Sequence, residues 1–148
     1  MNESVLMHLL PNEQSAIMAY LNRMWEQFAD RVLGVMLFGS KARGDAEVES
    51  DLDLLVLIDV ENREFRSELW RMAADISLEY NVVLSPRVIG QARWEEMGRM
   101  RLPLYRAIMA DGIALTPSRF PLDHHRPGLL PQLFMQPYTG FLEEYLSQ

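Results

Sequence analysis

Apolar residues recur along this chain with two spacings, one typical of helices and one typical of strands. Two long segments place an apolar residue every three or four positions, which marks one face of a helix. The first begins at Asn12, a residue type that can cap a helix, and runs to about Arg31. The second begins at Asn62, also a capping residue type, and runs to about Tyr80. The stripes are Ile17, Leu21, Met24 and Phe28 in the first helix, and Phe65, Leu69, Met72 and Ile76 in the second.

Shorter apolar runs lie between and after these helices and predict strands. Every residue from Leu54 to Ile58 is apolar, which is typical of a strand buried on both faces. The alternation of elements predicts an α/β (α+β) layer fold, a small mixed sheet with helices packed on one side. The predicted strands are Val32–Phe38, Asp51–Asp59, Val82–Ile89 and a short piece at Ile113–Leu115, with short helices at Trp94–Arg99 and from Pro103 to Gly112.

The composition changes after Leu115. Five of the eight prolines fall in the last 32 residues, so we expect a domain over residues 1–115 and a Pro-rich arm over residues 116–148. A short helix around Phe141–Leu146 is expected to end the arm. The arm also carries several aromatic residues, which indicates that it packs on the core or on a partner. They are Phe120, Phe134, Tyr138, Phe141 and Tyr145.

Composition and charge exclude several classes of protein. A chain of 148 residues with 49% hydrophobic residues is long enough for one domain with a real core. The chain has no cysteine, which excludes disulfide frameworks and thiolate metal sites. No apolar run reaches the roughly 20 residues of a membrane span, so we expect a cytoplasmic protein. The net charge of -7 argues against a broad nucleic-acid-binding face, which needs clustered cations.

A Gly-Ser turn at the end of the first predicted strand has the chemistry of a phosphate site. Gly39 lets the backbone come close to a ligand, and Ser40 can offer its N–H and its hydroxyl at the start of a helix. Lys41 and Arg43 follow in the same loop and add positive charge. A solvated loop charge is the simpler interpretation of Lys41.

Two aspartates begin the next predicted strand. Side chains alternate along a strand, so Asp51 and Asp53 point the same way, about 6.5–7 Å apart along the backbone. Two carboxylates this close repel each other unless a cation lies between them. Hard oxygen ligands suit Mg²⁺, which shares its coordination shell with substrate phosphates. The pattern therefore predicts a magnesium site at the edge of the sheet.

Together, Gly39-Ser40, ten intervening residues and Asp51-x-Asp53 form a specific pattern. It resembles the signature of the polymerase-beta-like nucleotidyltransferases, and within them the minimal nucleotidyltransferases of about this length. Further stretches look like the bacterial branch that is typically encoded beside HEPN-domain proteins, many of them toxic ribonucleases. These stretches are Tyr80–Pro86, Leu102–Arg106 and Asp111–Ile113.

The resemblance implies a fold, a reaction and a set of site residues. In such toxin–antitoxin pairs the nucleotidyltransferase moves AMP from ATP onto a hydroxyl of the HEPN toxin, with Mg²⁺ as the cofactor. Gly39 and Ser40 would hold the triphosphate, and Lys41 and Arg43 would add to nucleotide binding. Asp51 and Asp53 would be the metal ligands and catalytic residues. Whether the protein also forms a homo-oligomer is left open by the sequence.

The sequence departs from the family pattern at the third catalytic carboxylate. That residue belongs on the Val82–Ile89 strand, whose polar side chains are Ser85 and Arg87. Glu79, just before this strand, and Glu49, in the loop before Asp51, are the nearest candidates to replace it. The odd positions of this strand (Val83, Ser85, Arg87 and Ile89) are the ones expected to face Asp51 and Asp53, which would place the Arg87 cation near the metal pocket.

Two functions from different classes follow. The first is an adenylyltransferase that modifies a protein partner, with Mg²⁺, Ser40 and the loop amides stabilising the transferred phosphate. The second is a catalytically degenerate protein of the same fold that neutralises a HEPN partner by binding it. The intact Gly-Ser and Asp-x-Asp pattern favours the first function, and the missing carboxylate favours the second. An aminoglycoside-modifying enzyme fits less well, because those enzymes usually add a helical substrate domain.

Overall fold

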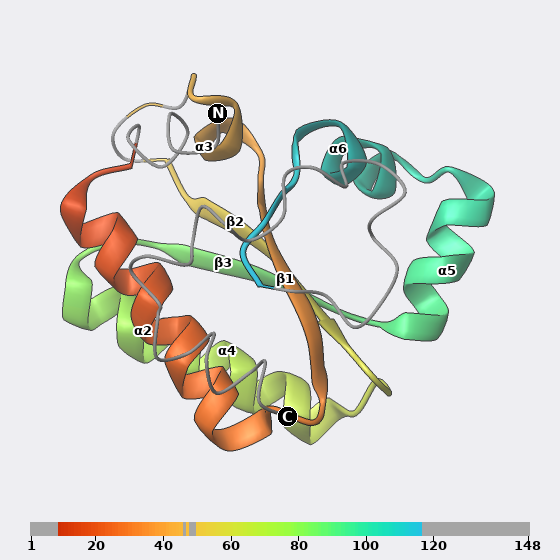
Figure 1. The fold of residues 1–148 in the computed structure, drawn as a ribbon, viewed down its shortest axis with the longest axis horizontal. Helices are drawn as coiled ribbons and strands as arrows, with labels where there is room; N and C mark the ends of the chain where they lie inside the picture. Colours follow the sequence, from red (N-terminus) through yellow and green to blue (C-terminus); the bar gives the residue numbers. More distant parts are fainter. Residues whose placement is uncertain (1–8, 46, 48–49, 117–148) are drawn as a thin grey trace.

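The computed structural model describes residues 9–45, 47 and 50–116, and its elements follow the predicted order (Figure 1). The predicted arm over residues 116–148 lies outside this part of the chain, apart from Thr116. Within the described residues the predicted helices and strands are all present, with ends shifted by a few residues, and the helix expected around Phe141–Leu146 lies outside them. The elements are α2 (Pro11–Phe28), β1 (Val32–Phe38), α3 (Ser40–Arg43), β2 (Leu52–Ile58), α4 (Arg63–Tyr80), β3 (Leu84–Gly90), α5 (Gln91–Met100), α6 (Pro103–Asp111) and β4 (Ile113–Ala114).

The strands form a mixed sheet in the order β3-β2-β1-β4. β1 is antiparallel to both of its neighbours, β2 and β4, whereas β2 and β3 are parallel and joined by α4. The register pairs Asp53 of β2 with Phe38 of β1 on one side and with Ser85 of β3 on the other. The predicted mixed sheet is confirmed, and Asp53 lies on β2, one of its two interior strands.

Helices cover both faces of this sheet (Figure 1). Leu54, Val56 and Ile58 of β2 belong to a core cluster with the buried residues of α2 and α4. Leu55 and Leu57, which alternate with them, belong to a second cluster with Trp94 and Met97 of α5 and Ile108 of α6. The prediction of helices on one side is therefore wrong for α5 and α6. A strand that is apolar at every position needs cover on both faces, and these short helices provide it.

The α2 and α4 helices pack against each other beside the sheet. The Tyr20 hydroxyl donates a hydrogen bond to the Leu69 carbonyl at 2.9 Å, and burial raises the Tyr20 pKa above its ordinary value. The rings of Phe28 and Phe65 meet edge to face, with centroids 4.8 Å apart.

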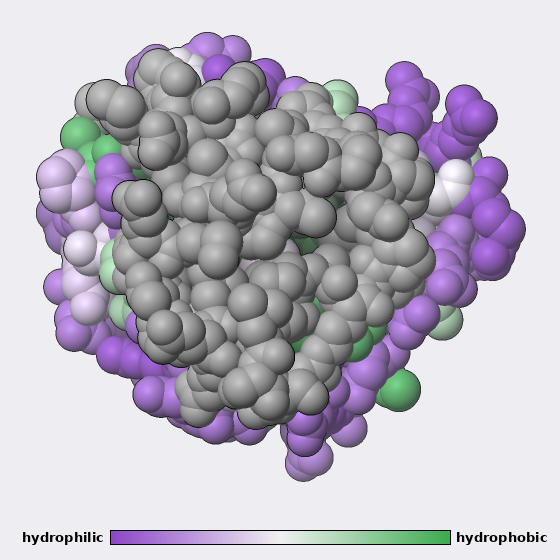
Figure 2. All heavy atoms as spheres, in the orientation of Figure 1, coloured by the Kyte–Doolittle hydropathy of each residue, from purple (hydrophilic) through white to green (hydrophobic). Residues whose placement is uncertain are grey.

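On the other side of the molecule, the outer surface of α5 is hydrophilic (Figure 2). Within the described ranges, no helix has both the length and the apolar character needed to span a membrane.

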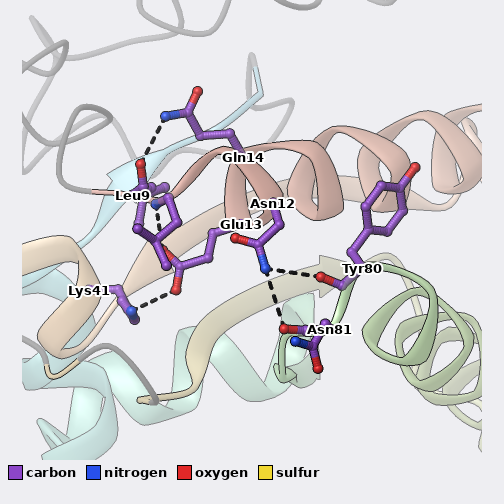
Figure 3. A network of polar contacts seen from close by, with 8 residues as sticks. Leu9, Asn12, Glu13, Gln14, Lys41, Tyr80 and Asn81 are labelled. Atoms are coloured by element: carbon purple, nitrogen blue, oxygen red, sulfur yellow. Dashed lines mark hydrogen bonds and ion pairs between the residues drawn. The ribbon is translucent and has the colours of Figure 1, made fainter.

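One predicted helix cap is confirmed and one is wrong. The Asn62 side chain accepts a hydrogen bond from the Phe65 N–H, as expected for the cap of α4. Asn12 does not cap α2, which begins at Pro11 after the N-cap Leu10. The Leu10 N–H donates instead to the Glu13 carboxylate, and the Asn12 amide donates to the carbonyls of Tyr80 and Asn81 (Figure 3). A proline suits the first turn of a helix, which moves the start of α2 by one residue.

Because helices cover both faces of β2, truncating an apolar side chain on either face should lower the free energy of unfolding by a similar amount. Leu54→Ala and Leu55→Ala should each lower the free energy of unfolding by about 2–5 kcal/mol, because both side chains are 0% exposed. Chemical denaturation followed by circular dichroism measures this cost. Val60→Ala is the control, since Val60 is 68% exposed. If Leu55→Ala behaved like this control, α5 and α6 would not form a real second layer.

Candidate active site

The chain turns sharply where β1 ends. Gly39 has φ 80° and ψ -160°, a conformation that essentially only glycine adopts. The Gly39 carbonyl accepts hydrogen bonds from the N–H groups of Ala42 and Arg43, both at 3.1 Å, so α3 begins at Ser40 as predicted. Within the part of the chain that the structure describes, no hydrogen bond uses the Ser40 N–H or hydroxyl as donor. Both groups are therefore available to a ligand.

Gly39 also lies directly against the Asp53 carboxylate. A Cβ atom at position 39 would lie 2.5 Å from Asp53 Oδ2, well inside van der Waals contact. The register explains this closeness, because Asp53 is paired with Phe38, the residue before Gly39. Any other residue at this position would both strain the backbone and displace the carboxylate. The predicted phosphate turn and the second predicted metal ligand are thus adjacent.

The two aspartates influence each other electrostatically. Asp53 is half-buried at the start of β2, and Asp51 is exposed one residue before that strand. Burial raises the pKa of Asp53, and the negative charge of Asp51 raises it further. The positive charges of Arg87 and Arg43 oppose this rise. A cation placed beside Asp53 would therefore stabilise its ionised form.

The third strand brings a cation to this face. The parallel register pairs Asp53 with Ser85 and Leu55 with Arg87, so Ser85 and Arg87 lie on the face of Asp53. The predicted odd-position face of this strand is confirmed. Arg87 is exposed, and its charge lowers the pKa of Asp53. The strand that should carry the third carboxylate therefore carries a guanidinium.

Neither carboxylate considered as a replacement is shown at the site. Glu79 lies on α4, which covers the opposite face of the sheet from Asp53, and it pairs with Arg23 of α2 at 3.0 Å. Glu49 lies outside the described residues. Among the residues that are described, no three or more His, Cys, Asp or Glu side chains form a group able to hold a metal ion. Asp51 and Asp53 thus remain the two carboxylates predicted for the site.

Arg43 is held at the edge of the site by residues distant in sequence. Its guanidinium donates to Asp45 at 3.2 Å and to Asp111, the last residue of α6, at 2.9 Å. These hydrogen bonds raise the pKa of Arg43. The role of Asp111 could not be inferred from sequence, because its spacing from Arg43 follows no local pattern. It links α6 to the turn that carries Ser40.

Lys41 differs from the simpler interpretation of the sequence. It is buried, with 5% of its surface exposed, so it is not a solvated loop charge. Its Nζ atom lies 2.6 Å from Glu13 Oε2 in α2 (Figure 3). The structure therefore shows this lysine in an ion pair inside the protein, and the expected nucleotide contact stays a prediction. A buried ammonium needs such a partner, and α2 supplies it.

Two curated relatives share sequence with this chain. It is 28% identical over 104 residues to "Putative protein adenylyltransferase MJ0604" of Methanocaldococcus jannaschii, an alignment that covers 70% of this chain and 98% of the relative. It is 38% identical over 58 residues to MJ0141 of the same organism, which has the same description. That alignment covers 38% of this chain and 59% of the relative.

Two solved structures and one family model also match. A crystal structure of a toxin–antitoxin with AMP-PNP aligns with a TM-score of 0.45 and 16% identity, covering 88% of this chain and 84% of that one. A mutant of the toxin–antitoxin MntA-HpeT aligns with a TM-score of 0.43 and 16% identity, covering 86% of this chain and 80% of that one. The model of the nucleotidyltransferase domain matches residues 17–108, which is more than half of the 148 residues. The chain therefore belongs to the nucleotidyltransferase domain family.

Proposed function

We propose that this protein transfers AMP from ATP to a hydroxyl group of a protein partner, with Mg²⁺ bound by Asp51 and Asp53. The contact of Gly39 with the Asp53 carboxylate supports this most strongly, because it unites the phosphate turn with the metal ligands. Family membership supports nucleotidyl transfer as the class of reaction. The descriptions of the two relatives support AMP as the group and a protein as the acceptor.

The donor set at the site fits Mg²⁺. Two carboxylates supply hard oxygen ligands, and a cation would offset the burial and the Asp51 charge that raise the pKa of Asp53 and disfavour its ionised form. Phosphate oxygens and water would complete the shell, as is usual for Mg²⁺ in sites with few protein ligands. When bound there, Mg²⁺ would neutralise charge on the triphosphate and orient it.

The remaining groups around the site suit the triphosphate. The Ser40 N–H and hydroxyl donate to phosphate oxygens, and the absence of a side chain at Gly39 allows their close approach. Arg87 has no ion pair among the described residues, and it binds the β- and γ-phosphates as they leave. The acceptor oxygen bonds to the α-phosphorus while the α–β bridging bond breaks. Pyrophosphate leaves, and the hydroxyl proton passes to water.

The partner we propose is a HEPN-type toxin, and the protein is its antitoxin. This proposal rests on the sequence resemblance of Tyr80–Pro86 and of the segments around α6 to the branch associated with HEPN proteins. A two-carboxylate site also supports a second candidate function, neutralisation of the same partner by binding alone. The two functions differ in whether a covalent bond forms.

Transfer of label separates these functions. With Mg²⁺ and the product of the neighbouring gene, ATP labelled at its α-phosphate should label the partner protein, and ATP labelled at its γ-phosphate should not. The Asp51→Asn/Asp53→Asn variant should give no label. Electrophoresis of the labelled proteins and mass spectrometry of the partner measure the result. A partner that is bound and silenced without label would reject transfer in favour of binding.

Binding of Mg-ATP should depend on the paired carboxylates. Asp51→Asn/Asp53→Asn removes both ligands, so calorimetry should show at least about a tenfold rise in Kd, which corresponds to about 1.4 kcal/mol. Asp59→Asn is the matched control, because Asp59 follows the other end of the same strand and pairs with Arg31. Equal binding by the wild type and the double variant would contradict the assignment of Asp51 and Asp53.

Without Mg²⁺, the Asp53→Asn variant should be more stable than the wild type at neutral pH. The pKa of Asp53 is higher in the folded state than in the unfolded state, so the protonated form of Asp53 favours folding. This contribution to stability is fully present below the unfolded pKa and is lost as the pH rises through the folded pKa, so at neutral pH the wild type lacks it. The gain should stay below about 1 kcal/mol because the charge is partly exposed.

Thermal unfolding over a pH series checks this sign. The gain of the variant should shrink as the pH falls through the folded pKa of Asp53 toward its unfolded value. Adding Mg²⁺ should raise the Tm of the wild type by mass action and leave the variant unchanged. A less stable variant at neutral pH would show that Asp53 supports the empty fold instead.

A further inference from the structure

Glu13 and Lys41 form the most deeply buried ion pair in the described part of the chain. Their side chains are 4% and 6% exposed, and the Nζ–Oε2 distance is 2.6 Å. Lys41 is the single lysine among the 148 residues, the other thirteen basic residues being arginines. Burying two charges is costly, and such a pair adds little net stability over a neutral pair of similar volume. Its presence beside Ser40 therefore points to a role other than stability.

Glu13 is a fixed acceptor. Its Oε1 atom accepts a hydrogen bond from the Leu10 N–H at 2.8 Å, which is the glutamate half of a capping box at the start of α2. The neighbouring Asn12 amide donates to the carbonyls of Tyr80 at 3.0 Å and Asn81 at 3.3 Å (Figure 3). The first turn of α2 is thus fastened to the end of α4, and it holds the Glu13 carboxylate in one place.

The turn that this pair holds is too short to be stable by itself. α3 has four residues, Ser40 to Arg43, and glycines with positive φ lie at both of its ends. A single helical turn fixes more backbone freedom than its hydrogen bonds repay, so its side chains must anchor it. Ala42 is buried, Arg43 bonds to Asp111, and Lys41 reaches Glu13. These anchors set the rotation of the turn, and with it the direction of the Ser40 N–H.

We propose that Glu13 and Lys41 are positioning residues for nucleotidyl transfer. Their ion pair fixes α3 against α2, so that the Ser40 donors face the edge where the Asp53 carboxylate lies. The inference rests on the proposed function and deepens it, since it assigns the geometry of the phosphate turn to a residue pair that touches no substrate. It also explains why the lysine of this loop points into the protein.

The double variant Glu13→Gln/Lys41→Met separates positioning from stability. Glutamine can still accept from the Leu10 N–H in the capping box, and methionine fills the space of the lysine chain without its charge. Unfolding should show a Tm equal to or above that of the wild type, because a neutral pair replaces a buried ionic one. The Kd for Mg-ATP, measured by calorimetry, should rise by about 10- to 100-fold, as for lost outer-shell support.

The structure offers a closely matched control pair. Glu61 Oε1 lies 3.0 Å from Arg66 Nη2, and Glu61 Oε2 accepts from the Gly90 N–H at 3.1 Å. Glu61→Gln/Arg66→Met therefore removes an ion pair whose acid also holds a backbone N–H, at the far end of β2 and β3. This control should bind Mg-ATP like the wild type. If Glu13→Gln/Lys41→Met also bound like the wild type, the positioning role would be wrong.

The wild type allows a second measurement that needs no variant. Isotope-labelled lysine gives one Nζ resonance in the magnetic resonance spectrum, because the chain has one lysine. The protons on Nζ should exchange slowly with water, both before and after Mg-ATP is added. A coupling between Nζ and a phosphorus atom in the complex would make Lys41 a ligand and overturn the inference. Absence of any Mg-ATP binding by the wild type would overturn the proposed function, and this inference with it.

Discussion

The contact between the Gly39 backbone and the Asp53 carboxylate is the constraint on which the site depends. It requires a glycine with φ 80° at the end of β1, an antiparallel register that pairs Phe38 with Asp53, and a short helix that begins at once after the turn. Each requirement belongs to a different level of structure, from backbone conformation to strand pairing. They meet where β1 ends and β2 begins, and there the Gly39 turn and the Asp53 carboxylate are adjacent.

Charge balance follows from this arrangement. Asp53 experiences one negative neighbour, Asp51, and two positive ones, Arg43 and Arg87. One of these cations is fastened by Asp111, and the other comes from β3, which in the family pattern supplies a carboxylate. Arg43 is already paired with Asp45 and Asp111, whereas Arg87 has no ion pair among the described residues, so Arg87 is the cation beside Asp53 that stays open to an anion.

Much of this could be predicted from the sequence, because the signals were local. The apolar stripes gave α2 and α4, the all-apolar run gave β2, and the alternation along β3 placed Arg87 on the face of Asp53. The mistakes concern partners distant in sequence. The role of Lys41 depends on Glu13, 28 positions away, and Asn12 binds carbonyls 68 and 69 positions away. The cover provided by α5 and α6 was likewise missed, although the all-apolar β2 required it.

The pairing of β2 has an evolutionary consequence. Its apolar residues lock the register on both faces, since a slip of one position would turn every side chain to the opposite side. Asp51 precedes this strand and Asp53 lies near its start, and neither belongs to the two apolar clusters, so substitutions there would change the candidate site and leave those clusters intact. Selection can therefore act on the reaction and on the shape separately. Lineages of this protein could therefore change the candidate site and retain the fold.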